Sequence, residues 1–286
     1  MYADDTKILS VINSEECRGK IQADLDNAFK WTQEWLLKFN IDKCLVKHYG
    51  FNNKKYLLYI NGKQLVESDL ERDLGIMFST SLKWKNQVIT ATNRANQMLG
   101  RIKKSFALFD CKLMRSLYLA FIRPYLEFAV PVWCPFLKSD IDMIEQVQQR
   151  ATKLIPAIRN LSYENRLRKL ELTTLKDRRL RGDLIQMFKI MNKMDKCDRY
   201  NRFKIILNQV RGHCFKYFKE ITRQPYRENF FCNRIVNIWN QLPSEIVEAT
   251  SVNSFKAGID HWMSSGRSNR CHSVPDNTLT GLASTA

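Results

Sequence analysis

The chain has 286 residues and carries 46 Lys and Arg against 29 Asp and Glu, a formal net charge of +17. Hydrophobic residues make up 44% of the sequence, which excludes a disordered chain and provides for a sizeable core. The excess of basic residues indicates a polyanionic partner, either nucleic acid or an acidic membrane surface, and leaves the fold open.

Residues 1–80 are nearly neutral, with 11 basic and 12 acidic side chains. A β-branched, apolar run at 6–12 predicts a strand, and apolar residues at helical spacing predict a helix from Ser14 to about Phe39. Further short strands are predicted at 45–46, at 56–66 around an Asn61-Gly62 hairpin turn, and at 74–78. This part is therefore predicted to hold one helix and a small antiparallel sheet.

Residues 81–286 hold 35 basic and 17 acidic side chains, a net charge of +18. Apolar side chains recur at steps of three and four, which predicts amphipathic helices. The helices are predicted from Trp84 to Phe106, from Leu113 to a stop before Pro124, from a Ser139 cap to Pro156, and from Leu180 to Met191. Short apolar runs occupy 200–262, and the Ser- and Thr-rich tail at 263–286 is predicted to be disordered.

No segment predicts export or insertion into a membrane. Acidic residues stand at positions 4 and 5, where a signal peptide is basic, and charged residues and prolines interrupt the most apolar stretch, 117–133. Eight cysteines without a C-x-x-C pair predict free thiols and a location in the nucleus or cytoplasm. The cysteines and histidines also lack the short spacing of zinc ligands, so no zinc site is predicted.

The sharpest candidate for chemistry is the box Tyr2-Ala3-Asp4-Asp5. Two adjacent carboxylates supply the hard oxygen ligands that Mg²⁺ prefers. Two such ions can stabilise the attacking and leaving oxygens of nucleotidyl transfer. The competing interpretation is a pair of solvated acids, which is the usual role of an Asp-Asp dipeptide.

Several further motifs follow this box in a fixed order. They are Phe39-Asn40-Ile41-Asp42-Lys43-Cys44, Leu74-Gly75 before Leu82-Lys83-Trp84, Arg123-Pro124-Tyr125-Leu126-Glu127-Phe128, Val132-Trp133-Cys134-Pro135, Ile144-Glu145-Gln146-Val147-Gln148, Arg150-Ala151-Thr152-Lys153, Arg178-Arg179-Leu180-Arg181-Gly182-Asp183-Leu184, Arg211-Gly212-His213, Asn229-Phe230-Phe231 and Trp239-Asn240-Gln241-Leu242-Pro243. Over about residues 1–262 the set resembles the reverse transcriptases of non-LTR (LINE-type, jockey-like) retrotransposons. Where that family usually has an aromatic residue before Leu-Gly, this chain has Asp73.

The resemblance implies an RNA-directed DNA polymerase that uses Mg²⁺. Asp4 and Asp5 would be the catalytic pair and the metal ligands, and Tyr2 would lie beside the primer terminus. Lys43 would lie near the pyrophosphate as a candidate general acid, although an exposed lysine at a helix end is an equally good interpretation. The implied partners are an RNA template, a DNA primer or target, and dNTP.

The resemblance also implies an α+β architecture in four parts. A partial polymerase palm would occupy 1–80, a helical thumb and connection 81–199, and a basic C-terminal helical region 200–262, before the tail. The family's fingers and first palm carboxylate would precede the Tyr-Ala-Asp-Asp box, whereas this chain begins one residue before it. We therefore expect the 286-residue chain not to polymerise DNA alone.

Clustered basic residues are the candidates for phosphate contacts. They are Lys103, Lys104, Arg150, Lys153, Arg166, Arg168, Lys169, Arg178, Arg179 and Arg181. A solvated helix face is the competing interpretation for each one, but the charge of the whole set favours RNA or DNA binding. Two alternatives to the polymerase stay open, a non-catalytic nucleic-acid-binding helical module and the product of a decayed retroelement.

Aromatic residues lie among basic ones near the C-terminal end and could stack on bases. They are Tyr217, Phe218, Tyr226, Phe230, Phe231 and Trp239. For most of them, packing in the core is the prediction.

Overall fold

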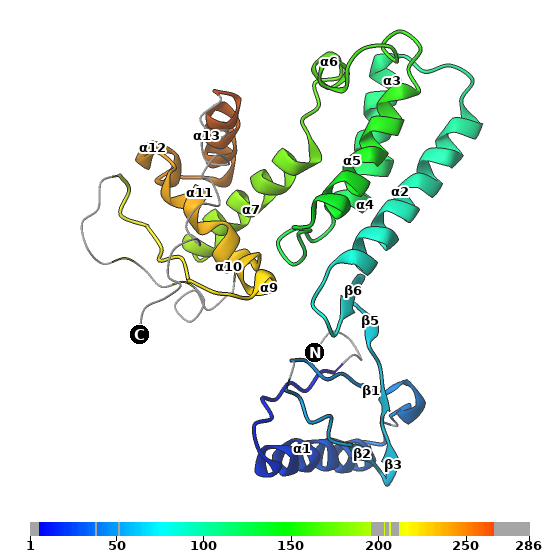
Figure 1. The fold of residues 1–286 in the computed structure, drawn as a ribbon, viewed down its shortest axis with the longest axis vertical. Coiled ribbons are helices and arrows are strands. Elements are labelled where there is room, and N and C mark those ends of the chain that lie inside the picture. The colour runs from blue at the N-terminus through cyan, green and yellow to red at the C-terminus, as the bar shows by residue number, and fades with distance from the viewer. Residues whose placement is uncertain are drawn as a thin grey trace, which may run out of the picture. The chain divides into compact units, whose positions relative to one another are not determined.

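The computed structural model describes residues 6–37, 39–50, 52–195, 203, 206 and 212–265. The fold is α+β, as predicted, and the chain forms two compact units, residues 1–86 and 87–286 (Figure 1). The first unit contains one long helix and all the short strands of the described residues, and the second is helical. The predicted tail lies outside the described residues from 266 onward.

Helix α1 (Glu15–Glu34) begins where the sequence predicts. The hydroxyl of Ser14 accepts a hydrogen bond from the Cys17 N–H, and two glutamates follow in the first turn, where the helix dipole favours negative charge. The helix ends five residues before the predicted Phe39, and the Trp35, Leu36 and Leu37 side chains beyond its end are exposed. Ile21 on its inner face packs into a small core with Leu58, Ile60 and Leu65.

Six short strands follow α1 in the first unit. They are β1 (Leu45–Val46), β2 (Tyr59–Ile60), β3 (Lys63–Gln64), β4 (Val66–Glu67), β5 (Leu70–Asp73) and β6 (Ile76–Ser79). β2 and β3 form the predicted hairpin, in which Asn61 and Gly62 have φ angles of 51° and 73°. Leu74-Gly75 makes a second tight turn between β5 and β6.

Two predictions for the first unit are wrong. The strands form three separate pairs in place of one antiparallel sheet, and the β1–β4 pair is parallel. Residues 6–12 form no strand, because no other described strand pairs with them and their Leu9 and Val11 side chains are left exposed. Asp73 pairs with Lys7 from this run and ends β5 at the second hairpin turn.

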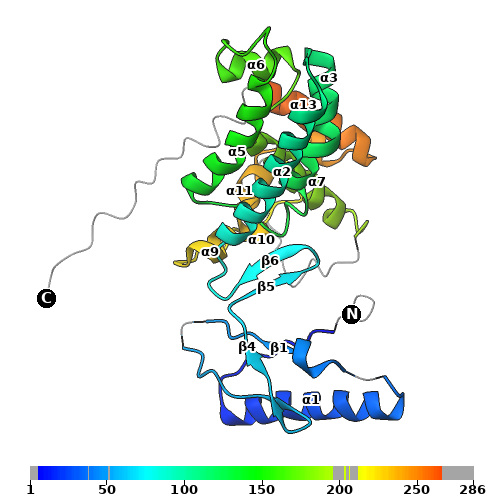
Figure 2. The same ribbon diagram turned by 90° about the vertical axis from the view of Figure 1, so that its right-hand side faces the viewer.

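The first half of the second unit is a set of helices joined by short loops (Figure 2). They are α2 (Lys85–Ser105), α3 (Cys111–Leu117), the π-helical turn η2 (Tyr118–Ile122), α4 (Arg123–Glu127), α5 (Lys138–Lys153), α6 (Tyr163–Lys169) and α7 (Leu175–Met191). Their apolar stripes match the predicted periodicity.

Three predicted helix boundaries in this half are wrong. Helix α7 begins at Leu175, with Thr174 as its N-cap, and not at the predicted Leu180. The helix that starts at α3 does not stop before Pro124 but continues through η2 into α4. Pro124 lies in the first turn of α4, directly after the π-helical turn η2, where the regular hydrogen-bond pattern of an α-helix is already interrupted. Helix α5 begins at Lys138 with Leu137 at its N-cap, so Ser139 lies inside the first turn and is not the cap.

One core joins α7 to the C-terminal helices. These are α9 (Pro225–Glu228), α10 (Phe231–Arg234), α11 (Val236–Asn240), α12 (Ser244–Val247) and α13 (Val252–Ser264). Phe188 of α7 stacks on Phe255 of α13, with ring centroids 4.3 Å apart. Because buried residues from Leu184 to Trp262 share this core, the structure does not divide at the predicted 199/200 boundary.

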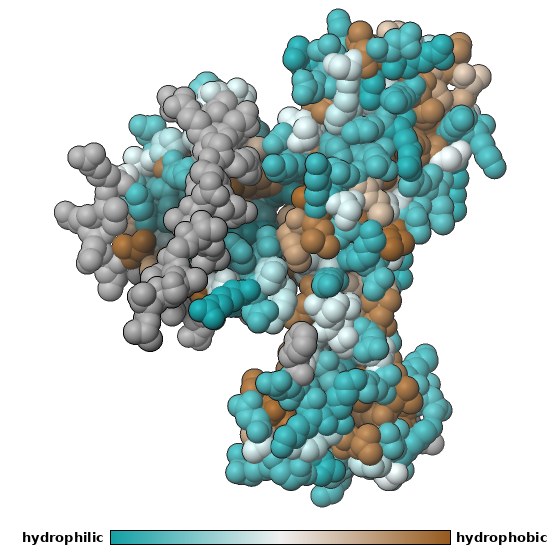
Figure 3. Space-filling model, viewed as in Figure 1, coloured by the Kyte–Doolittle hydropathy of each residue, from teal (hydrophilic) through white to brown (hydrophobic). Residues whose placement is uncertain are grey.

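The surface is mixed in character. No helix among the described residues is long and apolar enough to cross a bilayer. On the face shown in Figure 3, hydrophilic side chains predominate and hydrophobic ones gather in small patches.

Candidate functional site

Three of the four predicted catalytic and substrate residues, Tyr2, Asp4 and Asp5, lie outside the described residues. The fourth, Lys43, ends the single-turn helix η1 (Ile41–Lys43) and is exposed. Its neighbour Asp42 pairs with Lys63 of β3. Within the described ranges, no three His, Cys, Asp or Glu side chains gather closely enough to hold a metal ion.

Six of the predicted phosphate contacts are exposed, and they lie in the last turns of three helices. Lys103 and Lys104 belong to α2, Arg150 and Lys153 to α5, and Arg168 and Lys169 to α6. A helix C-terminus favours positive charge, which is a structural reason for their positions. The arrangement nevertheless presents all six cationic groups to solvent.

These six cations, named here the cationic face, form no ion pair with any described acidic residue. Arg150 is the one with side-chain partners, and both are neutral: its Nη1 lies 3.3 Å from Asn96 Oδ1 and its Nη2 3.4 Å from Gln146 Oε1. The bond to Asn96 links α5 to α2. A second bond, from Arg166 Nε to Thr152 Oγ1 at 3.0 Å, links α6 to α5. The three helices are therefore connected, and their exposed charges are available to a polyanion.

The remaining predicted contacts are held inside the second unit. Arg179 is buried, and its guanidinium carbon lies 4.3 Å from the centre of the Trp133 ring. Its Nη2 donates to the Leu126 carbonyl oxygen at 2.7 Å. This burial contradicts the prediction that Arg179 contacts phosphate: the side chain attaches α7 to α4 and to the segment that follows α4.

Arg166 is also buried, and it donates to the Leu161 carbonyl oxygen at 2.8 Å as well as to Thr152. Arg178 forms two 3.0 Å bonds with the Glu127 carboxylate. Arg181 forms bonds of 2.6 and 2.8 Å with Asp260. These bonds indicate that the three arginines connect segments of the second unit to one another.

A buried ion pair, Arg234 with Asp183, connects α10 to α7. Nε and Nη2 of Arg234 each lie 2.8 Å from a different Asp183 oxygen. Nη1 donates to the Asn229 carbonyl oxygen at 3.1 Å, and Nη2 also lies 3.2 Å from that of Val130. Burial raises the pKa of Asp183, which the adjacent Arg234 charge opposes. Sequence reasoning did not single out Arg234 at all.

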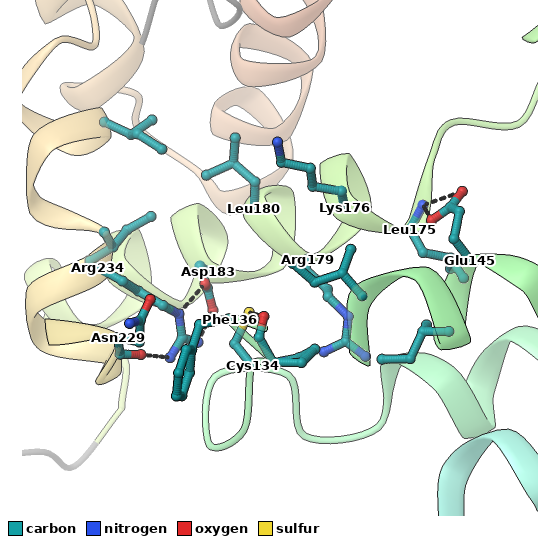
Figure 4. Close-up of a pocket in the computed structure, with 15 residues that line it drawn as sticks. Cys134, Phe136, Glu145, Leu175, Lys176, Arg179, Leu180, Asp183, Asn229 and Arg234 are labelled. Carbon is teal, nitrogen blue, oxygen red and sulfur yellow. Dashed lines mark hydrogen bonds and ion pairs between the residues drawn. The ribbon is translucent and has the colours of Figure 1, made fainter. Parts of the chain in front are cut away.

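A cleft of about 290 Å³ lies over this pair, between α5, α7, α10, α11 and the 134–136 loop. Figure 4 shows Arg234 bonded to Asp183 at one end of the view and Glu145 bonded to the Leu175 backbone at the other. Phe136 and Leu180 supply apolar walls. The buried or half-buried charged groups of Arg179, Asp183, Arg234 and Glu145 already bond within the chain, and the fifth charged residue of the lining, Lys176, is exposed. This arrangement is typical of a packing defect between helices.

Glu145 belongs to a chain of polar side chains between α5, α6 and η2. The hydroxyl of Tyr118 bonds to Gln148, Gln148 Nε2 lies 2.9 Å from the Tyr163 hydroxyl, and that hydroxyl donates to Glu145. The Leu175 N–H donates to Glu145 Oε2 at 3.0 Å. Burial raises the pKa of Glu145 above its ordinary value, and these two hydrogen bonds oppose the shift.

Glu145→Gln is therefore expected to change how stability depends on pH. Because the folded pKa of Glu145 is raised, the folded chain binds more protons here than the unfolded chain does. The contribution of Glu145 to stability thus falls as pH rises from its ordinary pKa through its folded pKa. The free energy of unfolding is measured in urea from about pH 4 to pH 7. Over this range it should fall less steeply with rising pH in Glu145→Gln than in the parent chain, because the variant has no carboxyl group to titrate at this position. Glu164→Gln, at an exposed position, is the control; parallel curves for Glu145→Gln and the parent chain would contradict the prediction.

The aromatic residues divide into two groups. Tyr217, Phe231 and Trp239 are buried, in agreement with the prediction of core packing. The other three, Phe218, Tyr226 and Phe230, are exposed.

His213 has the geometry of core packing, and its neighbour Cys214 does not. His213 is buried with its Nε2 3.0 Å from the Trp239 carbonyl oxygen, whereas Cys214 is exposed. Burial lowers the pKa of His213, so the neutral ring is favoured at this position.

No protein-family model, curated protein or solved structure matches the chain. The functional conclusion therefore depends on the motifs and on the geometry of the described residues.

Proposed function

We propose that the chain is part of an RNA-directed DNA polymerase of the non-LTR retrotransposon class, and that its second unit binds the RNA–DNA duplex. The observation that carries the binding role is the cationic face on α2, α5 and α6, without acidic partners among the described residues. The second unit as a whole has 33 basic and 17 acidic side chains. The other four predicted contacts, Arg166, Arg178, Arg179 and Arg181, already bond to groups within the chain, so among the predicted contacts these six supply the charge that phosphates would meet.

Lysines make up four of the six groups, and this composition favours contact with phosphates over reading of bases. An ammonium group on a flexible stem acts as a point charge, and phosphate contacts position a protein on a duplex without selecting sequence. Nucleotide polymerisation needs that kind of grip, because the enzyme moves along its template. A non-catalytic nucleic-acid-binding module would use the same face and is the second candidate.

The polymerase class depends on the resemblance of the motifs. In this proposal Asp4 and Asp5 would hold Mg²⁺, which would supply Lewis-acid stabilisation of the phosphate oxygens. Tyr2 would lie beside the primer terminus, and Lys43, which is exposed, could donate a proton to the departing pyrophosphate.

Replacing three lysines of the cationic face is expected to weaken duplex binding and its dependence on salt. In Lys103→Gln/Lys104→Gln/Lys153→Gln, the slope of log affinity against log salt should become less negative by about 0.9 for each phosphate that the protein no longer neutralises. The control, Lys30→Gln/Lys54→Gln/Lys83→Gln, removes the same charge from exposed positions in the first unit. Fluorescence anisotropy with a labelled RNA–DNA duplex of about 20 base pairs, at about 50 to 200 mM salt, measures both variants.

Equal losses in the two triple variants would contradict the proposal, because net charge alone would then explain the binding. An absence of binding even at low salt would leave the decayed-product interpretation. Primer extension on poly(rA)/oligo(dT) is the separate readout of the polymerase role. Mg²⁺-dependent incorporation that is lost in Asp4→Ala would assign catalysis to this chain, and duplex binding without incorporation would favour the binding module.

A further inference from the structure

An extended segment, residues 213–223, lies along α10 and α11 and leads into α9, where Figure 1 shows it as a yellow trace. Two asparagine side chains hold its backbone. Asn240 accepts from the Tyr217 N–H at 2.9 Å and donates to the Tyr217 carbonyl at 2.7 Å. Asn233 bonds in the same way to both backbone groups of Glu220, each at 3.0 Å. The two amides thus satisfy backbone groups of the extended chain at Tyr217 and Glu220, and the Ile206 N–H donates to the Lys216 carbonyl at 3.0 Å.

This attachment decides which side chains face solvent. Tyr217 points into the core, and the indole N–H of Trp239 fixes the Phe215 carbonyl at 2.8 Å. Five large apolar side chains between residues 212 and 230 are then exposed, and four of them are aromatic: Phe215 (42%), Phe218 (57%), Ile221 (93%), Tyr226 (43%) and Phe230 (39%). Aromatic rings of this size normally bury their faces, so this concentration of exposed rings in one short stretch of the chain indicates a ligand.

Cations alternate with these rings. The segment from 212 to 230 holds four basic side chains, Lys216, Lys219, Arg223 and Arg227, and two acidic ones. Arg227 pairs with Glu220 at 2.6 Å, and Lys219 pairs with Glu228 at 3.7 Å, so both carboxylates are engaged within the segment. The Arg227 guanidinium carbon also lies 5.6 Å from the centre of the Phe230 ring. The surface is therefore aromatic and positively charged, which fits a ligand with flat rings and negative charge.

We propose that this surface, Phe215, Phe218, Tyr226 and Phe230 with their neighbouring cations, binds single-stranded RNA or DNA. Only an unpaired strand offers base faces to protein rings, because in a duplex each base is stacked between its neighbours. Stacking tolerates any sequence, since every base has a flat face. The site lies on different elements from the cationic face and takes a different form of nucleic acid, so it does not depend on the duplex-binding role.

The test is the double variant Phe218→Ala/Tyr226→Ala in the full chain, with labelled single strands of RNA and of DNA about 20 nucleotides long. Loss of two stacking rings is expected to weaken single-strand binding at least about tenfold. The loss should be similar at every salt concentration, because stacking releases no counterions. The RNA–DNA duplex should bind as it does to the parent chain, whereas the lysine variant of the cationic face should bind the duplex more weakly.

Two controls keep the result decisive. Phe121→Ala/Phe128→Ala removes two rings of similar exposure, 51% and 53%, from elsewhere in the second unit and should leave binding unchanged. Phe218→Trp keeps a stacking surface and should retain affinity, with unchanged circular dichroism as the test of folding. Unchanged single-strand binding by Phe218→Ala/Tyr226→Ala, or an equal loss in the Phe121→Ala/Phe128→Ala control, would overturn the proposal. So would binding of the parent chain to vesicles containing phosphatidylserine but not to either oligonucleotide.

Discussion

Arg234→Met is expected to destabilise the second unit by about 3–5 kcal/mol, the usual cost of leaving a buried charge without its partner. The Asp183 side chain is 5% exposed and has both carboxylate oxygens bonded to Arg234. Methionine fills much of the same volume but supplies no donor. Asp183 must then lose its charge or admit water, and the Asn229 and Val130 carbonyl oxygens each lose a donor as well.

The matched control for this pair is Arg181→Met. Arg181 also forms two bonds with a carboxylate, but its partner Asp260 is 51% exposed, so the expected loss is only about 0–1 kcal/mol. Urea unfolding followed by the fluorescence of the buried Trp133, Trp239 and Trp262 measures both variants. The parent chain and both variants carry phenylalanine in place of Trp31, Trp35 and Trp84, so that the fluorescence comes from the second unit.

The double variant Asp183→Leu/Arg234→Met separates the effect of an unpaired charge from the loss of packing. Because neither charge is then buried, we expect it to be more stable than Arg234→Met alone. A double variant less stable than Arg234→Met, or equal losses from Arg234→Met and Arg181→Met, would show that burial of the pair does not determine its contribution.

Trp239→Ala is expected to cost about 3–5 kcal/mol of unfolding free energy, as large-to-small changes of buried aromatic residues do. Its side chain is fully buried, its ring centre lies 6.1 Å from those of both His213 and Phe255, and its indole N–H holds the Phe215 carbonyl. The change would open a cavity between α11 and α13 and free one end of the 213–223 segment. Single-strand binding should weaken together with stability.

Trp239→Phe distinguishes the two contributions of this residue. It keeps most of the ring packing but removes the indole donor, so the expected loss is about 1–3 kcal/mol, the cost of a buried carbonyl group without a partner. Phe121→Ala, at a position 51% exposed, should change stability by less than about 0.5 kcal/mol. Chemical unfolding followed by helical circular dichroism measures all three variants, and a loss of the same size in Trp239→Ala and Phe121→Ala would contradict the expectation.

Local chemistry explains which parts of the fold were predictable. The Ser14 cap and the Asn61-Gly62 turn are decided within a few residues, and both are where the sequence predicts them. The apolar run at 6–12 has strand composition, but a strand needs a partner, and pairing is decided by the rest of the unit. The parallel β1–β4 pair and the continuation of the helix through Pro124 were not predictable for the same reason: both depend on contacts with residues far away in the sequence.

The candidate interface was predictable only in part, for a geometric reason. Adjacent helical residues point about 100° apart. The basic run at 178–181 therefore sends Arg178 to Glu127, Arg179 to Trp133 and Arg181 to Asp260, partners far away in the sequence. The sequence shows three positive charges in this run, whereas in the folded chain each of the three side chains contacts a partner within the second unit. Lys103 and Lys104 differ, because the apolar stripe of α2 already predicts that they face away from the core.

The core shared by α7 and α13 has a consequence for how the chain is made. Leu184, Phe188 and Met191 are synthesised 73 to 80 residues before the helix that covers them, Val252–Ser264, is complete. At about 5–20 residues per second, the apolar face of α7 stays uncovered for several seconds. A nascent chain stopped near residue 199 would carry that face without its cover, so the second unit completes its folding late in synthesis.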